Sequence, residues 1–365
     1  MKMILRPWRL HYAAATSVFL IMLTMVALMV GMVGCDTTPS AGVEIRDWHD
    51  LDAVRKNLGG KFLLMNNLDS TTAGYAELAS PTANGGKGWQ PIGIWPNPFT
   101  GSFDGQGFEI RDLFIDRPGE DTVGLFSFVN TGATIVSIAL MDADVTGELY
   151  AGGLVGHNRG SLSNCHSTGS VTGYTYVGGL IGENGGTVSN SHSTAIVSGS
   201  SEVGGLIGQN HGAVSKSYST GSATGDSYVG GLVGWNHEGS VDNSYSSARV
   251  DGELLVGGLT GHNRASVSNC YSTGNVTGYE DAGGLVGRNY EGTVSNSFWD
   301  IETSGQATSD GGTGKNTTEM QDIAPFSGAT WNIGTVANPS MRDTSYVWNI
   351  VQNMTYPFLA WQMVV

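Results

Sequence analysis

The chain contains few cysteines, few prolines and few charged residues. Of its 365 residues, 3 are cysteine and 10 are proline, and Asp, Glu, Lys and Arg together make up 13%, about half the usual share. Three cysteines are too few for a disulfide scaffold or a cysteine-based zinc site. Collagen is also excluded, because proline is scarce and there is no strict Gly-X-Y period.

Basic residues are scarcer than acidic ones. The chain has 17 Lys and Arg against 32 Asp and Glu, which gives a formal net charge of −15. An acidic surface repels the phosphates of nucleic acids, so we expect no nucleic-acid partner.

Glycine, in contrast, is abundant, at 55 residues. Hydrophobic residues make up 40% of the chain, with 9 Trp, 13 Tyr and 11 Phe, a composition too apolar for simple disorder. The glycines are therefore expected to serve a regular architecture, and a β-protein with many tight bends is the first candidate.

The N-terminus has the features of an export signal. Lys2, Arg6 and Arg9 precede an uncharged segment, 12–34, that is long enough to span a bilayer. The segment ends in a small residue followed by Cys35, which resembles a bacterial lipoprotein signal. We therefore interpret residues 1–34 as a signal peptide cut before Cys35, whose thiol would carry diacylglycerol. The alternative is an uncleaved membrane anchor.

Both interpretations predict that the rest of the chain is exported. Residues 35–42 would form a tether, and the protein would be membrane-anchored at the cell surface or in the periplasm.

One motif of the form Gly-Gly-Leu-x-Gly recurs six times. Its copies begin at positions separated by steps of 26, 26, 26, 27 and 26 residues, namely Ala151, Val177, Val203, Val229, Val256 and Ala282. The extra residue lies in the turn 236–239. Such short units, built of β-prone segments between glycines and asparagines, cannot bury a core alone and must stack. We predict an all-β fold, a parallel β-helix (β-solenoid) of about 26-residue coils with right-handed coiling.

Stacking places equivalent residues above one another at the strand spacing of about 4.8 Å. It predicts a leucine column of Leu154, Leu180, Leu206, Leu232, Leu259 and Leu285. A second apolar column comprises Leu162, Val188, Val214, Val241, Val267 and Val294. A third, ring-bearing column comprises His166, His192, Tyr218, Tyr245, Tyr271 and Phe298.

An asparagine ladder is predicted in the same way, and comprises Asn158, Asn184, Asn210, Asn236, Asn263 and Asn289. Asparagine tolerates the left-handed conformation, so we expect these residues at a bend, with amides bonded from coil to coil. The Gly-Gly pair permits close backbone approach or a positive φ. Cys165 and Cys270 share a column four coils apart, about 19 Å, so we expect free thiols.

The Gly-Gly-Leu-x-Gly signature over residues 151–300 resembles the GLUG-motif repeats of bacterial surface and adhesin-like proteins. Such repeats accompany IgA-specific metallopeptidases. The segment 99–107 resembles an element that often precedes them, and 123–147 resembles a degenerate first coil. The resulting division is an N-terminal cap with first coils at 43–122, the GLUG-type β-solenoid at 123–300 and a C-terminal cap at 301–365.

Short helices are expected in both caps. Asp47 is placed to cap a helix that continues through Val54 and stops at 59–60, before a strand at 61–68. A second helix is expected to begin at Asn316. The C-terminal aromatics are interpreted as the core of the cap rather than a ligand site, and they are Trp331, Trp348, Tyr356, Phe358 and Trp361.

Motifs for catalysis are missing from the sequence. It has no His-Glu-x-x-His, no Gly-x-Ser-x-Gly and no P-loop, so the peptidase associated with the family is not expected here. We predict no enzymatic activity, no cofactor and no metal site. The acids of one variable turn are interpreted as a solvated edge rather than a Ca²⁺ site, and they are Glu202, Asp226, Glu253, Glu280 and Asp281.

One column varies between coils while its neighbours stay constant, and it comprises His157, Glu183, Gln209, Trp235, His262 and Arg288. Because the fold does not dictate these side chains, we expect them to point outward. The predicted ligand ridge consists of His157, His211, Trp235, His262, Arg288 and Tyr290. It could bind a glycan or a surface protein. The alternative is an ordinary exposed turn column.

The sequence thus predicts an envelope-anchored protein with a non-catalytic adhesion or scaffold role. A polysaccharide-active β-helix enzyme and a purely structural spacer are the alternatives.

Overall fold

The computed structural model describes residues 42–362. The predicted signal peptide, Cys35 and the tether up to residue 41 lie outside this range. Within the described residues, no helix is long and apolar enough to cross a membrane.

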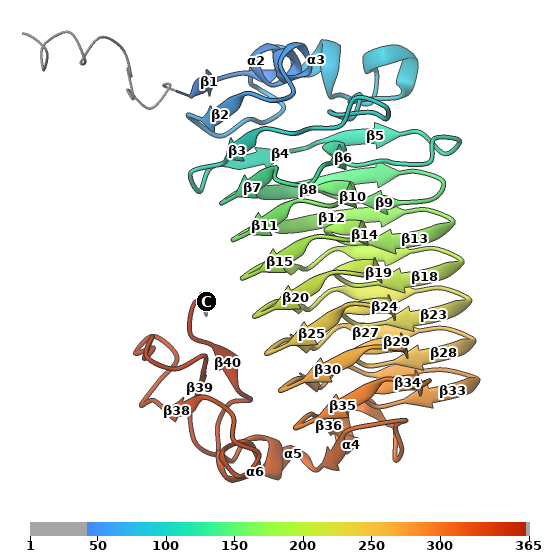
Figure 1. Ribbon diagram of the computed structural model, residues 1–365, viewed down its shortest axis with the longest axis vertical. Helices are drawn as coiled ribbons and strands as arrows, with labels where there is room; N and C mark the ends of the chain where they lie inside the picture. Colours follow the sequence, from blue (N-terminus) through green and yellow to red (C-terminus); the bar gives the residue numbers. More distant parts are fainter. Residues whose placement is uncertain (1–41, 363–365) are drawn as a thin grey trace, which may run out of the picture. The chain divides into compact units, whose positions relative to one another are not determined.

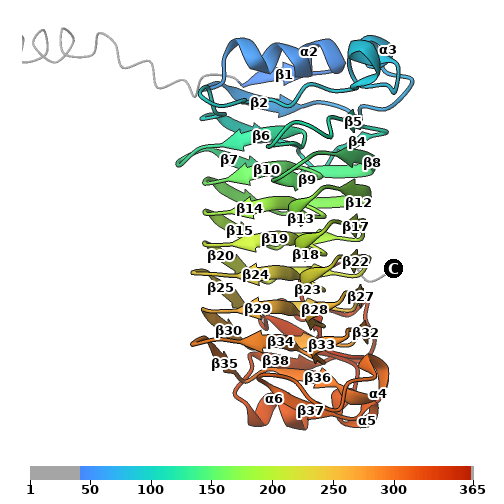
Figure 2. The same ribbon diagram turned by 90° about the vertical axis from the view of Figure 1, so that its right-hand side faces the viewer.

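The prediction of a parallel β-solenoid is confirmed. Successive coils stack through parallel sheets (Figures 1 and 2), and the register repeats the sequence period, with Val155 beside Ile181 and Asn158 beside Asn184. The direction of coiling stays a prediction.

Four sheets run along the stack. The ten-stranded sheet contains β1 (Val43–Ile45), β2 (Lys61–Leu64), β3 (Ser102–Asp104), β7 (Thr134–Val136), β11 (Ser161–Ser163), β15 (Thr187–Ser189), β20 (Ala213–Ser215), β25 (Ser240–Asp242), β30 (Ser266–Ser268) and β35 (Thr293–Ser295). The seven-stranded sheet contains β6 (Phe126–Val129), β10 (Val155–Asn158), β14 (Ile181–Asn184), β19 (Ile207–Asn210), β24 (Val233–Asn236), β29 (Thr260–Asn263) and β34 (Val286–Asn289).

The six-stranded sheet contains β9 (Ala151–Gly152), β13 (Thr175–Gly178), β18 (Ser201–Gly204), β23 (Ser227–Gly230), β28 (Leu254–Gly257) and β33 (Glu280–Gly283). The fourteen-stranded sheet contains β4 (Glu109–Arg111), β5 (Phe114–Asp116), β8 (Ala139–Thr146), β12 (His166–Thr172), β16 (His192–Ser193), β17 (Ile196–Ser198), β21 (Tyr218–Ser219), β22 (Ser222–Thr224), β26 (Tyr245–Ser246), β27 (Arg249–Asp251), β31 (Tyr271–Ser272), β32 (Val276–Thr277), β36 (Phe298–Asp300) and β37 (Thr313–Lys315).

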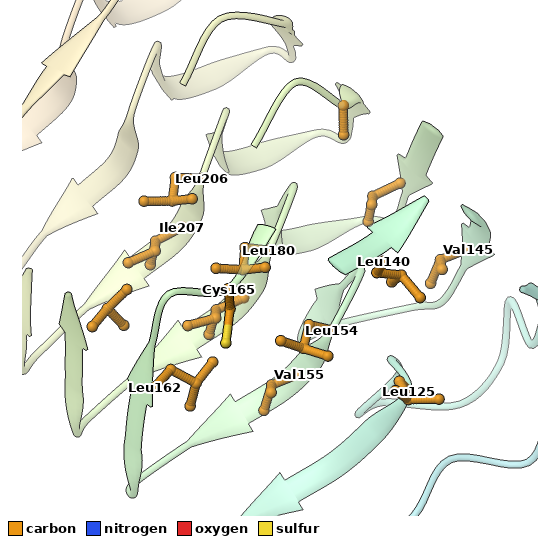
Figure 3. Close-up of a cluster of buried hydrophobic side chains, with 14 of the residues drawn as sticks. Leu125, Leu140, Val145, Leu154, Val155, Leu162, Cys165, Leu180, Leu206 and Ile207 are labelled. Atoms are coloured by element: carbon orange, nitrogen blue, oxygen red, sulfur yellow. The ribbon is translucent and has the colours of Figure 1, made fainter. Parts of the chain in front are cut away.

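The core is built from the predicted columns. All six members of the leucine column are fully buried, and Figure 3 shows Leu154, Leu180 and Leu206 in the interior. Cys165 and Cys270 are buried free thiols, as expected. Burial raises the pKa of Cys165 to about 12.

The asparagine ladder hydrogen-bonds between coils, but it does not lie at a left-handed bend. Each amide Nδ2 from Asn158 to Asn263 donates to Oδ1 of the next ladder asparagine, at 2.7–2.9 Å. The left-handed expectation is wrong because these residues end strands of the seven-stranded sheet. The positive φ angles near this part of each coil belong to another column, namely Asn164, Asn190, Lys216, Asn243, Asn269 and Asn296.

The motif glycines allow two backbones to approach closely. A Cβ on Gly178 would lie 1.9 Å from the carbonyl oxygen of Ile181, and one on Gly208 would lie 2.5 Å from the carbonyl carbon of Tyr176. Any larger residue would push the six-stranded and seven-stranded sheets apart.

The N-terminal cap begins with α2 (Trp48–Ala53), where the Asp47 side chain accepts a hydrogen bond from the Asp50 amide. The cap also contains η1 (Val54–Lys56), α3 (Tyr75–Leu78) and η2 (Ala83–Gly86). The strand expected at 61–68 is shorter, because β2 ends at Leu64.

The C-terminal region does more than close the stack. It comprises α4 (Ile301–Ser304), β37, α5 (Thr317–Met320), α6 (Ala324–Gly328), β38 (Ile333–Thr335), β39 (Trp348–Ile350) and β40 (Phe358–Leu359). Strand β37 pairs with β36 of the last coil, and Asn316 caps the N-terminus of α5 in a capping box with Glu319.

Beyond α6 the chain lies alongside the coils (Figure 1), whereas the sequence predicted a cap over the end of the stack. Indole Nε1 of Trp348 donates to Asn243 Oδ1 at 3.1 Å, and that of Trp361 donates to the Lys216 carbonyl at 2.9 Å. The reason is the ring-bearing column, whose members from His166 to Tyr271 stack at 4.6–4.9 Å. The rings of this column point away from the core of the coils, and the C-terminal aromatics pack against them and bury them.

Candidate functional site: the variable face

Three columns of side chains that differ from coil to coil lie side by side, and we call them together the variable face. Column one comprises Tyr150, Tyr176, Glu202, Tyr228, Leu255 and Asp281. Column two, on the seven-stranded sheet, comprises His157, Glu183, Gln209, Trp235, His262 and Arg288. Column three follows the asparagine ladder and comprises Arg159, Gly185, His211, His237, Arg264 and Tyr290.

Column one is held in place by an unusual backbone conformation. Tyr176, Glu202, Tyr228, Leu255 and Asp281 have φ angles between 50° and 58°. Few non-glycine residues adopt this region. The conformation turns these side chains over column two, and Tyr228 lies 5.8 Å from Trp235. Tyr150, the first residue of column one, meets His157 edge-on at 5.8 Å.

The first coils of the face contain a series of polar contacts. Nε of Arg159 donates to Nε2 of His157 at 3.2 Å. Nδ1 of His157 lies 3.4 Å from Oε2 of Glu183, whose Oε1 lies 3.9 Å from Nε2 of His211. The His157 ring also stacks on Phe128 at 4.4 Å.

Burial sets the charge state of these groups. It lowers the pKa of His157 to about 4, with a further contribution from the Arg159 charge. It raises the pKa of Glu183, and it lowers that of His211. His157 is therefore neutral at pH 7. Because its Nε2 accepts from Arg159, its proton resides on Nδ1, facing Glu183.

The later coils of the face are aromatic. The rings of Trp235 and His262 stack at 5.8 Å and 8°, and His237 meets Trp235 edge-on at 4.5 Å. The Arg264 guanidinium lies over the Tyr290 ring at 5.4 Å. Burial lowers the pKa of His262 to about 4.

Several polar atoms of this face are buried and, among the described residues, have no hydrogen-bond partner. They are Nε1 of Trp235, both ring nitrogens of His262, Nδ1 of His237 and Oε2 of Glu202. Native proteins rarely leave such atoms unsatisfied, and each one calls for a partner such as water, an ion or a ligand.

The predicted ridge residues are brought together on this face, but the ridge does not project as expected. His157 is only 9% exposed, and His211, Trp235 and His262 are half-buried. Arg288 and Tyr290 are exposed. The outward-pointing expectation fails for the first four because columns one and three pack against column two.

The prediction that the turn acids form a solvated edge is wrong for Glu202. That residue is 7% exposed, and burial raises its pKa to about 7. The other four acids of the turn are exposed. Glu202 differs because it takes a column-one position between two tyrosines, whereas Asp226 and Glu253 precede that column.

A cluster of His211, His237 and Glu238 was not identified from the sequence. Its ligand-capable atoms lie within 4.8 Å of one another. The usable signal was positional: the two histidines occupy the same place in adjacent coils, and an extra residue in the turn after Asn236 adds Glu238 beside them.

Two open clefts lie elsewhere, against the C-terminal region. One, of about 360 Å³, is lined by residues that include Asn190, Lys216 and Trp361. The other, of about 410 Å³, is lined by residues that include Phe298 and Lys315.

Comparison with known proteins shows that the chain carries GLUG repeats. The model of the GLUG motif matches residues 147–172, 173–198, 225–251 and 252–277. Halomucin of Haloquadratum walsbyi is 36% identical over 138 residues, which are 36% of this chain and 2% of halomucin. A "Putative Gly-rich membrane protein" of Evansella cellulosilytica is 33% identical over 119 residues, 31% of this chain and 13% of that protein. The chain thus spans a small part of these relatives.

A solved structure shares the fold. The crystal structure of a putative immunoglobulin A1 protease from Bacteroides ovatus has a TM-score of 0.55 and 17% identity, covering 89% of this chain and 94% of that one. At this identity, the likeness concerns the fold alone. Together, the comparisons show a chain that carries GLUG repeats and has a β-solenoid fold.

Proposed function

We propose that this protein is anchored to the cell envelope and that its variable face binds an extended glycan without cleaving it. The observation that carries the proposal is the coincidence of aromatic rings and unpartnered polar atoms at Trp235 and His262, within the described part of the chain. Sugars present apolar faces and hydroxyl groups, which aromatic rings and orphaned donors or acceptors complement. A surface protein is the second ligand class.

The stacked architecture supports an extended ligand. Equivalent side chains recur once per coil along columns one to three, so a polymer lying along the face would meet a new set of groups at every strand spacing of about 4.8 Å. Differences between coils would give the face its specificity. The names of the relatives agree with a location at the cell surface.

The proposal is tested by incubating the full-length protein, purified in detergent, with a glycan array and with cell-wall polysaccharides. We expect binding by wild type, weakened binding by Trp235→Ala, and full binding by the control Tyr279→Ala, whose ring is 93% exposed. Equal binding by wild type and Trp235→Ala would exclude the variable face as the site. A silent array would favour a structural spacer.

Anchoring is proposed through the lipid on Cys35. The Cys35→Ala variant should leave the membrane fraction, because the thiol that carries diacylglycerol is removed. Unchanged partition would instead favour the uncleaved membrane segment at 12–34.

Polysaccharide cleavage is the second candidate function, and one observation favours it. Burial raises the pKa of both Glu183 and Glu202. Burial, with further contributions from the Glu202 and Glu183 charges, also raises the pKa of Tyr176. Glycoside hydrolysis uses two carboxyl groups, of which the general acid has a raised pKa and its partner is ionised. Release of reducing ends by wild type, and its loss in Glu202→Gln, would replace the binding proposal with this one.

A further inference from the structure

We propose that His211, His237 and Glu238 bind one divalent transition-metal ion, with Zn²⁺ as the reference ion, between two adjacent coils. The proposal is independent of glycan binding.

The three side chains converge from two turns. His211 follows Asn210 at the end of β19, and His237 and Glu238 follow Asn236 at the end of β24. Nδ1 of His211 lies 3.8 Å from Oε2 of Glu238, and Nδ1 of His237 lies 3.8 Å from Oε1 of the same carboxylate. Ligands on one zinc ion, bound at about 2.0–2.2 Å, lie about 3–4 Å apart, so only small side-chain rotations are needed.

Two features beyond proximity point to a metal. Nδ1 of His237 is a buried atom that has no hydrogen-bond partner anywhere in 42–362, so a lone pair is left for an ion. Nε2 of His211 lies 3.9 Å from Glu183 Oε1, on the ring side opposite Glu238. Metal-binding histidines commonly direct their second nitrogen at a carboxylate, which orients the ring.

Two imidazoles and one carboxylate select the class of ion. This donor set suits Zn²⁺ and its neighbours Co²⁺, Ni²⁺ and Cu²⁺, whereas Ca²⁺ and Mg²⁺ prefer oxygen ligands alone. Three protein ligands leave a position for water or another ligand. The Glu238 side chain is 71% exposed, so that position opens to solvent.

Another turn of the repeat array provides a control for Glu238. The turn after Asn289 also has an extra residue, and Glu291 there corresponds to Glu238. Column three offers Arg264 and Tyr290 at that level in place of two histidines. Glu291→Gln is therefore a matched control for Glu238→Gln: both remove one exposed turn carboxylate, and only one removes a ligand.

The test uses full-length protein without a histidine tag, purified in detergent and stripped with a chelator. Zn²⁺ is titrated calorimetrically, and Co²⁺ is titrated by its visible absorption, which reports imidazole and carboxylate ligation directly. We expect one Zn²⁺ per chain in wild type and Glu291→Gln. Saturable binding should be lost in His237→Asn and Glu238→Gln, and Glu183→Gln should weaken it about 10-fold.

Circular dichroism of each variant separates ligand loss from misfolding, and Glu238→Gln covers the case in which His237→Asn does not fold. Absent saturable binding by wild type, or unchanged binding by folded His237→Asn or Glu238→Gln, overturns the proposal. The glycan assay is repeated in the presence of a chelator to separate the two proposals. Glycan binding without metal would show that the two sites act independently, so that either proposal can fail without the other.

Discussion

Asn210 lies in the middle of the asparagine ladder, and truncating it to alanine tests how the coils are held together. Its Nδ2 donates to Asn236 Oδ1 at 2.9 Å and to the Gly212 carbonyl at 3.1 Å. Its Oδ1 accepts from Asn184 Nδ2 at 2.8 Å and from the Gly212 amide at 3.2 Å. The residue is fully buried, so water cannot replace these bonds.

The cost follows from which atoms lose their partners. The Gly212 amide keeps a bond to the Asn184 carbonyl, and Asn184 Nδ2 keeps a weak one to Gly186. Oδ1 of Asn236, however, loses the ladder donor given to it by Asn210. One orphaned buried acceptor costs about 1–3 kcal/mol, and the lost bond to the Gly212 carbonyl adds about 1 kcal/mol. We expect Asn210→Ala to lower the free energy of unfolding by about 2–4 kcal/mol.

Asn289→Ala is the matched control at the end of the ladder. Asn289 is half-buried, accepts from Asn263 and donates to the Gly292 carbonyl. Because Asn263 Nδ2 also donates to the Ala265 carbonyl, truncation should cost only about 1 kcal/mol. Urea unfolding followed by tryptophan fluorescence measures both variants at pH 7, with equal m-values as the check on comparable unfolding. Equal stabilities of the two variants would refute the ladder reasoning.

Two further predictions concern buried ionisable groups. Burial raises the pKa of Glu202 from 4.5 to about 7. Between these values the folded state binds more protons than the unfolded state. The contribution of Glu202 to the free energy of unfolding is therefore most favourable at low pH and is lost as the pH rises through 7. The stability of wild type minus that of Glu202→Gln should therefore rise by about 2–3 kcal/mol from pH 8 to pH 5, and a pH-independent difference in urea unfolding would contradict this. Cys165 and Cys270 are buried thiols with raised pKa values. In a Cys35→Ala variant at pH 8, both thiols should react with a colorimetric disulfide reagent only after unfolding. Reaction in the native state would show that the coils open.

The period of the repeat was enough to predict the coils. A 26-residue step aligns each copy with the next, and apolar residues that keep one place in every copy, such as Leu154 and Leu180, must face the interior. The aromatic column and the free thiols follow from the same alignment. These predictions depend only on which residues are aligned between successive coils, and the repeat period gives that alignment directly.

Features that depend on backbone angles could not be predicted in this way. The left-handed positions fall on Tyr176 and Glu202 as well as on Asn164, although tyrosine and glutamate give no signal for positive φ. That conformation buries Glu202 and covers column two, so the exposure of the variable face was overestimated. The lateral packing of Trp348 and Trp361 was also missed, because aromatic content indicates burial but not the surface that is covered.

The most direct test of the central claim is equilibrium binding of the strongest polysaccharide ligand from the array to wild type and to Trp235→Ala. Trp235 lies mid-face, stacked on His262, with its indole Nε1 unpartnered among residues 42–362. Removing such a ring should cost about 2 kcal/mol, or roughly 30-fold in Kd. A Kd for Trp235→Ala within about twofold of the wild-type value, in a variant whose circular dichroism is unchanged, would contradict the assignment of the variable face as the binding surface.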